Sequence, residues 1–170
     1  MKIPNRADPR SFSSGSEISG TLAGEVDGDG ASMKLSNGKV VNLRLAYGDA
    51  PETEKKDKDG KVTKLGQPFG PEAQQHLAKL VTGKKLTAKV IEPASEKNYW
   101  RPVVVLQADG VDVNKEMLGS GYHWPQSRTI PIEYWDAAAQ GQINKSGAMS
   151  EKNPERASKF RARLFSSIYE

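Results

Sequence analysis

The chain has 170 residues, of which 36% are hydrophobic and 27% charged, and this length and composition predict one domain with tails. Its formal net charge of +4 slightly favours a polyanionic partner, and its lack of cysteine excludes disulfide frameworks, thiolate zinc sites and cysteine nucleophiles. Two histidines do not favour a multi-histidine metal centre, and no apolar run reaches the length of about 18 residues that a membrane span needs.

The first half of the chain is predicted to be mainly strands. Residues 1–16 are polar, have no sustained hydrophobic period and predict a flexible N-terminal arm. Three strands follow at 18–26, 31–35 and 40–45, the last with a clear apolar–polar alternation. Residues 51–70 are predicted to be a charged, solvated loop.

The second half adds helices. A helix is expected to begin at Pro71 and to end at Gly83. Two further strands are predicted over 86–91 and 103–108, and further helices over 113–118, 132–143 and 155–168. Five short strands with a helix after the third indicate an α+β fold that is mainly β, a small closed barrel with about three packed helices.

Four short motifs carry the residue types of a catalytic site. They are Asp27-Gly28-Asp29, Arg44 on the third strand, Asp49-Ala50-Pro51-Glu52 just after it, and Tyr99-Trp100-Arg101 before the fifth strand. Each alone has an ordinary interpretation, since Asp-Gly is common in turns and a single arginine on a strand usually faces solvent. The set therefore has to be judged by its order and spacing.

In order and spacing, these motifs resemble the staphylococcal nuclease (thermonuclease) family over roughly residues 20–160. The matching segments are Val26-Asp27-Gly28-Asp29, Leu43-Arg44-Leu45, Gly48-Asp49-Ala50-Pro51-Glu52, Phe69-Gly70-Pro71-Glu72-Ala73, Tyr99-Trp100-Arg101, and the pair Val113-Asn114 with Met117-Leu118. The resemblance implies a five-stranded OB-fold nuclease domain over residues 17–170, with a C-terminal helical extension. It also implies a calcium-dependent, sugar-non-specific nuclease that cleaves the P–O5′ bond of DNA and RNA and leaves 3′-phosphate ends.

The resemblance also implies a role for each matching residue. Asp29, Asp49 and the backbone carbonyl of Ala50 match the oxygen ligands of Ca²⁺, a hard cation that accepts such ligands. Glu52 matches the general base or water-orienting carboxylate. Arg44 and Arg101 match the two guanidinium groups that stabilise the charge of the phosphate in the transition state.

Several positions depart from the family pattern. Gly30 stands where a threonine is usual, which predicts weaker Ca²⁺ binding, and Trp100 replaces a glycine, which predicts a shifted Arg101. The aromatic pair that stacks on bases has no clear counterpart. Tyr122 and Trp124 are candidates for that role, and core or rim positions are the alternative for both.

Basic residues outside the motifs give weaker signals. Lys55 and Lys56 are candidates for contacts with the phosphate backbone, with a solvated loop as the alternative. The basic C-terminal helix, with Arg161 among its residues, predicts either a polyanion patch or a solvated helix face.

The expected partners are DNA and RNA, with single-stranded or flexible regions favoured. We expect a monomer that does not act at a membrane. Residues 1–20 have no apolar segment of a secretion signal, and a mature extracellular or periplasmic form is favoured over a cytoplasmic one. A non-catalytic oligonucleotide-binding module is the alternative function, and a module that binds a protein or a sugar is a weaker one.

Overall fold

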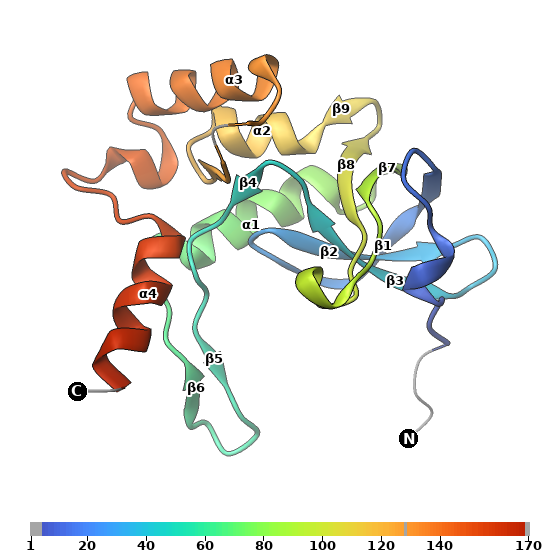
Figure 1. Ribbon diagram of the computed structural model, residues 1–170, viewed down its shortest axis with the longest axis horizontal. Coiled ribbons are helices and arrows are strands. Elements are labelled where there is room, and N and C mark those ends of the chain that lie inside the picture. The colour runs from blue at the N-terminus through green and yellow to red at the C-terminus, as the bar shows by residue number, and fades with distance from the viewer. Residues whose placement is uncertain (1–4, 128, 169–170) are drawn as a thin grey trace. The chain divides into compact units, whose positions relative to one another are not determined.

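The computed structural model describes residues 5–127 and 129–168 (Figure 1). The chain forms two compact units. Unit 1 contains Met1–Ala46 and His76–Asn114, and unit 2 contains Tyr47–Gln75 and Lys115–Glu170. The prediction of a single nuclease domain over residues 17–170 stays a prediction.

Unit 1 contains a sheet that closes on itself. Its strands are β1 (Glu17–Asp27), β2 (Gly30–Leu35), β3 (Val40–Leu45), β7 (Leu86–Glu92), β8 (Val103–Ala108) and the short β9 (Val111–Asp112). They lie in the order β3-β2-β1-β7-β8-β9, and β3 also pairs in parallel with β8, so that five strands form a ring of hydrogen bonds. The prediction of an α+β fold, mainly β and barrel-like, is confirmed.

The alternation of apolar and polar residues in β3 distinguishes the inner face of this ring from its outer face. Val41, Leu43 and Leu45 are at most 2% exposed, whereas Asn42 and Arg44 between them are only partly buried. Side chains of successive strand residues point to opposite faces, so the apolar set fills the interior and leaves Arg44 on the other face. Other strands add buried Met33, Val90 and Leu106 to the same core.

The N-terminal segment contacts the strands of unit 1. The amide of Ala7 donates to the Val40 carbonyl at 2.9 Å, and the amide of Gly15 donates to the Val90 carbonyl at 2.8 Å. A short 3-10 helix, η1 (Pro9–Ser11), lies between these contacts. Residues 1–4 of the predicted arm lie outside the described residues, and its flexibility stays a prediction.

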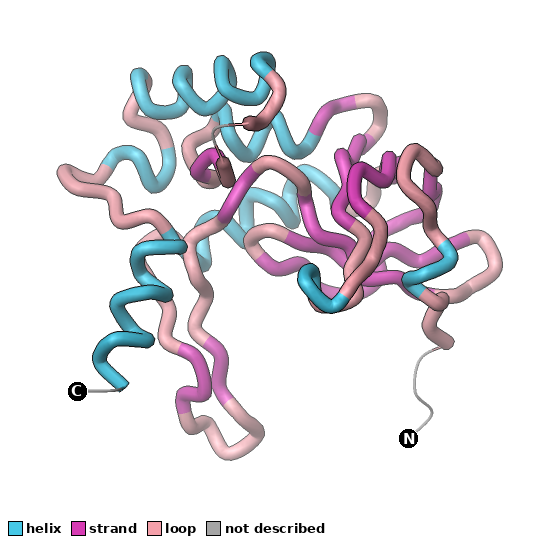
Figure 2. The backbone as a smooth tube through the Cα atoms, viewed as in Figure 1, coloured by secondary structure: helices cyan, strands magenta, loops and turns pink. Residues whose placement is uncertain are grey.

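Unit 2 begins with short strands in the segment that was predicted to be a loop. Its strands are β4 (Gly48–Asp49), which pairs with β10 (Trp124–Pro125), and β5 (Lys55–Lys56), which pairs with β6 (Val62–Lys64). The loop prediction over 51–70 is therefore wrong at the β5–β6 hairpin, shown in Figure 2 as two short magenta stretches joined by a pink turn. The Asp57 carboxylate accepts bonds from the amides of Asp59 and Lys61, each at 2.9 Å, which stabilises that turn.

Four α-helices complete the described chain, close to the predicted bounds. They are α1 (Gly70–Val81), α2 (Val113–Gly119), α3 (Ile132–Ile143) and α4 (Ala157–Ile168), with short 3-10 helices η2 (Glu96–Asn98) and η3 (Gly147–Ser150). In unit 2, Trp124, Ala148, Met149 and Ala157 form a buried cluster against which Phe69 packs. Among the described residues, none of the helices combines the length and the apolar character that crossing a bilayer requires.

Candidate active site

In unit 1, the turn after β1 brings Asp29 to Arg44. Arg44 Nη1 lies 3.2 Å from a carboxylate oxygen of Asp29 and donates to the Asp29 carbonyl, also at 3.2 Å. The Leu45 amide donates to the same carbonyl at 2.9 Å. The side chains are 13% exposed for Arg44 and 26% for Asp29, so this pair is largely shielded from water and positioned by the backbone.

Arg101 belongs to the same part of unit 1. The Pro102 carbonyl accepts the Arg44 amide at 3.0 Å, because Arg44 stands opposite Val103 in the β3–β8 pair. A Cβ atom added to Gly30 would lie 3.4 Å from Arg101 Nη1 and 2.7 Å from the Leu43 carbonyl oxygen. Gly30 thus lets β2 approach β3 closely, and the structure gathers Asp29, Arg44 and Arg101 around it.

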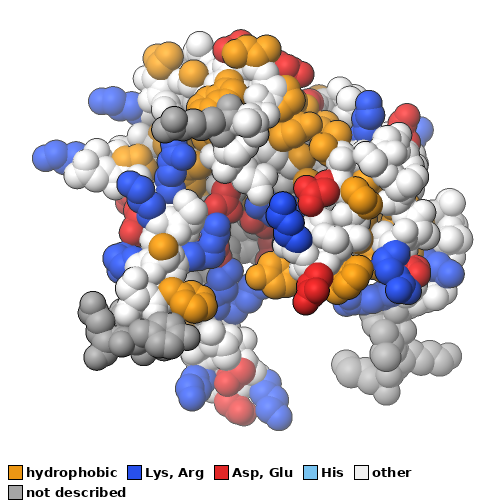
Figure 3. Space-filling model, in the orientation of Figure 1, with side chains coloured by type: hydrophobic (Ala, Val, Ile, Leu, Met, Phe, Trp, Pro, Cys, Tyr) orange, Lys and Arg blue, Asp and Glu red, His pale blue; other side chains and the backbone are white. Residues whose placement is uncertain are grey.

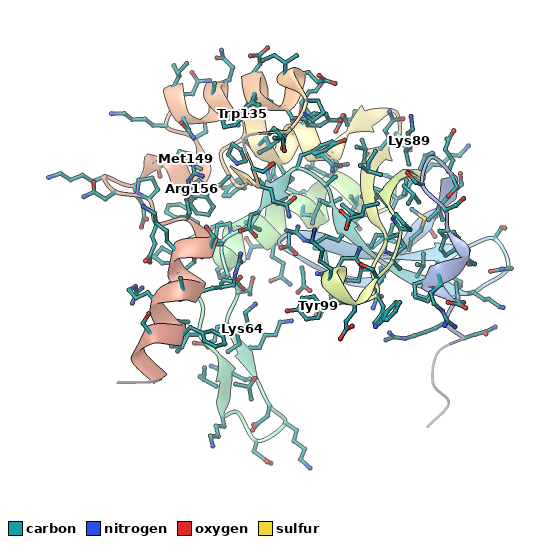
Figure 4. All side chains as sticks on the ribbon, viewed as in Figure 1. Lys64, Lys89, Tyr99, Trp135, Met149 and Arg156 are labelled. Carbon is teal, nitrogen blue, oxygen red and sulfur yellow. The ribbon has the colours of Figure 1, made fainter. Side chains whose placement is uncertain are left out.

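A rigid turn presents two aromatic side chains next to Arg101. Tyr99 and Trp100 both have left-handed backbones, with φ of 54° and 57°, and their exposed fractions are 81% and 50%. Buried Asn98 stabilises the turn, since its side chain accepts the Ser95 amide at 2.7 Å and donates to the Pro93 carbonyl at 2.9 Å. Figure 4 shows the Tyr99 side chain extending from this turn.

In unit 2, Asp49, Ala50 and Glu52 follow one another along a segment that is fixed at several points. Asp49 pairs with Trp124 in the β4–β10 ladder, and Ala50 is 4% exposed. The Glu52 amide donates to the Gln67 side chain at 3.0 Å, and the Glu52 carbonyl accepts the Gln67 amide at 2.9 Å. The Asp49 and Glu52 side chains are 13% and 10% exposed, so two acidic groups stand at this partly buried position.

Arg161 of α4 binds both of these carboxylates. Its Nη2 donates to Asp49 Oδ2 at 2.9 Å and its Nη1 to Glu52 Oε1 at 2.5 Å, with a longer contact of 3.4 Å from Nη1 to Asp49 Oδ1. Lys64 of β6, labelled in Figure 4, forms an ion pair with the other oxygen of Glu52. These contacts were not predictable from local sequence patterns, because 112 and 109 residues separate Arg161 from its two partners.

The charge state of Arg161 follows from this environment. Partial burial alone would lower the pKa of its guanidinium, but the hydrogen bonds to Asp49 and Glu52 outweigh this effect and raise the pKa above its usual range. Arg161 is therefore a permanent cation at the two carboxylates, not the solvated helix-face residue that its basic neighbours suggested.

The weaker substrate-binding candidates differ in how exposed their side chains are. Trp124 is 4% exposed and packs in the cluster of unit 2, so no ring face is available to a base and its core alternative holds. Tyr122 is partly buried. Lys55 and Lys56 are exposed on the β5–β6 hairpin, where Lys and Arg atoms, blue in Figure 3, alternate with acidic ones. Their contact with substrate stays a prediction.

The described residues contain no preformed metal cluster. Within residues 5–127 and 129–168, no three His, Asp or Glu side chains are grouped to hold an ion. Asp49 and Glu52 nevertheless both bind one cation, the Arg161 guanidinium. The donor chemistry fits a hard cation.

Known proteins share part of this chain. A protein of Capnoides sempervirens named an uncharacterized 38.1 kDa protein is 31% identical over 121 residues, which are 69% of this chain and 31% of that protein. A protein of Oryza sativa subsp. japonica named a probable staphylococcal-like nuclease is 29% identical over 121 residues, again 69% of this chain and 31% of that protein. The chain thus matches less than a third of the length of these relatives.

A family model places these likenesses. The model described as staphylococcal nuclease homologue matches residues 42–147, which is more than half of the chain. The match contains Arg44, Asp49, Glu52 and Arg101, whereas Asp29 precedes it and α4 follows it. The resemblance drawn from the sequence motifs is thereby confirmed, and the chain belongs to the staphylococcal nuclease family.

Proposed function

We propose that this chain is a calcium-dependent nuclease that hydrolyses phosphodiester bonds of DNA and RNA without sugar specificity, cleaving P–O5′ to leave 3′-phosphate ends. The observation that carries the proposal is the grouping of Asp29, Arg44 and Arg101 around Gly30 in unit 1. The nuclease name of the rice relative supports the same activity class. We further propose that it acts as a monomer, with single-stranded or flexible regions as its preferred substrates.

The arginines bind and stabilise the phosphate. Arg44 and Arg101 each carry a guanidinium, whose planar donors match two phosphate oxygens at once. Arg44 is 13% exposed, and a charge–charge interaction is stronger where less water screens it. The extra negative charge that develops on the phosphate oxygens during attack is then stabilised by groups that are already oriented.

The carboxylates have two proposed tasks. Asp29, Asp49 and the Ala50 carbonyl would hold Ca²⁺, which when bound polarises the phosphate and neutralises its charge. Glu52 would accept a proton from the attacking water or orient it, a task that needs a carboxylate within hydrogen-bond reach of that water. Gln67 fixes the Glu52 backbone through both the Glu52 amide and the Glu52 carbonyl, at 3.0 and 2.9 Å. The backbone that carries this carboxylate is therefore restrained.

The proposed roles assign residues of both units to one reaction. The proposal requires Asp29, Arg44 and Arg101 to act on the same phosphate as Asp49 and Glu52. A double-mutant cycle between Arg44 and Glu52 measures this, because residues of one site lose activity non-additively.

The test is cleavage of single-stranded DNA and of RNA in Ca²⁺, with and without a chelator. We expect chelator-sensitive cleavage of both polymers by the wild type and a loss of about 100- to 1,000-fold in Arg44→Ala. Arg10→Ala, which removes an exposed arginine paired with Asp8, serves as the matched control and should cut normally. Binding without chelator-sensitive cleavage would instead support the oligonucleotide-binding module.

A further inference from the structure

We propose that α4 is a self-inhibitory cap, in which Arg161 competes with the divalent cation for Asp49 and also occupies the neighbouring Glu52. The inference rests on the proposed function, because it concerns access to the same carboxylates. Arg161 is 45% exposed, yet its guanidinium reaches Asp49 at 2.9 Å and Glu52 at 2.5 Å. One helix of unit 2 therefore places its own positive group on two acids assigned to catalysis.

The charges at this position cancel. Asp49 and Glu52 carry two negative charges, and Arg161 and Lys64 supply two positive ones through the ion pairs described above. A divalent ion that approaches the carboxylates meets two cations, and repulsion between like charges at such distances lowers its affinity. Moving Arg161 away restores the negative potential that attracts the ion.

The attachment of α4 suits a part that can open. Near its start, Ala157 is fully buried and Phe160 is 6% exposed, and the carbonyl of Glu155 accepts a bond from the Gln67 side chain at 2.8 Å. After Arg161 the described side chains are exposed or only partly buried, with Phe165 67% exposed. Segments with few buried apolar contacts open at low free-energy cost, so the part of α4 that begins at the half-exposed Arg161 can move while its start stays anchored.

In the sequence, α4 follows the segment that the family model matches. The family match ends at residue 147, and α4 begins at Ala157. The residues assigned to chemistry from Arg44 to Arg101 lie inside the match, while the residue that blocks two of them lies outside it. Arg161 thus lies outside the segment that the family model matches.

Calorimetric titration of the full chain with Ca²⁺ alone tests the cap. We expect Arg161→Ala to bind Ca²⁺ about 3- to 10-fold more tightly than the wild type, as expected when partly exposed ion pairs are lost. Arg163→Ala, which removes an ion pair with Glu155 on the same helix, should leave the Ca²⁺ affinity unchanged. Hydrogen exchange of α4 amides in the wild type should quicken when Ca²⁺ is added.

The outcomes separate the cap from the nuclease proposal. Equal or weaker Ca²⁺ binding in Arg161→Ala, or slower exchange of α4 with Ca²⁺, overturns the cap even when cleavage stays chelator-sensitive. In that case Arg161 orients the carboxylates instead. If neither the wild type nor Arg161→Ala binds Ca²⁺ and the wild type does not cut, both proposals fail. Tighter binding with an equal fall in the half-saturating Ca²⁺ for cleavage supports the cap.

A second observation, independent of α4, concerns Trp100. We infer that its indole is a stacking platform for a nucleobase next to the phosphate-binding Arg101, a role that also rests on the proposed function. A tryptophan at φ 57° is strained, since side chains other than glycine rarely adopt this region, and its ring is nevertheless half exposed. Strain that persists at a surface position, with no burial to compensate it fully, points to a function for the ring.

The surroundings of Trp100 fit a nucleotide. Its amide donates to the Ser95 carbonyl at 2.8 Å, and the Arg101 amide donates to the Asn98 carbonyl at 3.2 Å, so the turn holds both residues in fixed order. A flat aromatic side chain on the residue before an arginine offers stacking for a base and charge for its phosphate. Stacking needs an unpaired base, so Trp100 should favour single strands over duplex.

Binding of a short single-stranded oligonucleotide in chelator, where cleavage is suppressed, tests this role. We expect Trp100→Gly to weaken binding about 5- to 100-fold and Trp100→Phe to retain most of it. An abasic oligonucleotide of equal charge should bind wild type and Trp100→Gly alike. Equal binding of the normal oligonucleotide by both proteins overturns the inference. Wild-type chelator-sensitive cleavage, measured alongside, reports separately on the nuclease proposal.

Discussion

The candidate residues of the two units are held in different ways. In unit 1, Arg44 is positioned by strand register and by backbone carbonyls, and its partner Asp29 lies in the adjoining turn. In unit 2, Asp49 and Glu52 are paired with a side chain of a helix that is more than 100 residues further along the chain. Groups fixed by a sheet are ready to bind before substrate arrives, whereas groups held by a long cationic side chain can exchange that partner for another cation.

We call Asp49 and Glu52, whose cationic partner can be exchanged, the exchangeable half. The largest loss of activity should come from a change in this half. Glu52→Gln keeps the size of the side chain but removes its basicity, so we expect cleavage to fall about 100- to 10,000-fold. Initial rates on single-stranded DNA at saturating Ca²⁺ measure this. Glu54→Gln is the matched control, because Glu54 is an exposed acid on the same segment, 3.3 Å from Lys56. Normal cleavage by Glu52→Gln would remove Glu52 from the mechanism.

A smaller effect is expected in the sheet-held half, the group of Asp29, Arg44 and Arg101 around Gly30 in unit 1. In Gly30→Ala, the new Cβ atom would lie 2.7 Å from the Leu43 carbonyl oxygen, and backbone must shift to make room. We expect the free energy of unfolding to fall by about 1–3 kcal/mol. Urea denaturation measures it, with Gly119→Ala as the control because the nearest atom to its added Cβ is 3.8 Å away. If Gly30→Ala left the free energy of unfolding unchanged, β2 and β3 would be packed less tightly at Gly30 than we infer.

The smallest effect concerns the start of α4 and its dependence on pH. Hydrogen bonding to Arg163 lowers the pKa of Glu155 below its ordinary value of 4.5. A lowered folded-state pKa means that the contribution to stability is present above pH 4.5 and is lost as the pH falls through the folded-state value. The difference in melting temperature between wild type and Glu155→Gln should therefore shrink below that pH. A difference that grows on acidification would contradict the assignment.

The sequence predicted the sheet-held half well because its signals are local. Alternation in β3 identifies Arg44 as the residue outside the apolar interior, and Asp-Gly-Asp marks the turn that carries Asp29. The strands and helices followed from the same kind of pattern. Their bounds shifted only by a few residues.

The exchangeable half contained what the sequence could not indicate. Whether Arg161 faces water or binds Asp49 depends on the packing of α4, since the spacing of basic residues along a helix is the same in both cases. The β5–β6 hairpin was not predicted because its many charged residues indicate a solvated loop. Its turn depends on hydrogen bonds to the Asp57 side chain. Trp124 was ambiguous for a similar reason, as an aromatic residue serves equally well in a core or on a rim.

The parallel pair of β3 and β8 has a consequence for how this protein behaves in crowded solutions. Strands at the margin of an open sheet expose rows of amides and carbonyls onto which a neighbouring molecule can add a strand of its own. Here β3 bonds to β2 on one side and, at Arg44 and Leu45, to β8 on the other, while Arg6 bridges to Val40 at its beginning. Intermolecular strand addition at β3 must first break these contacts, so the ring itself protects unit 1 against fibrous self-assembly.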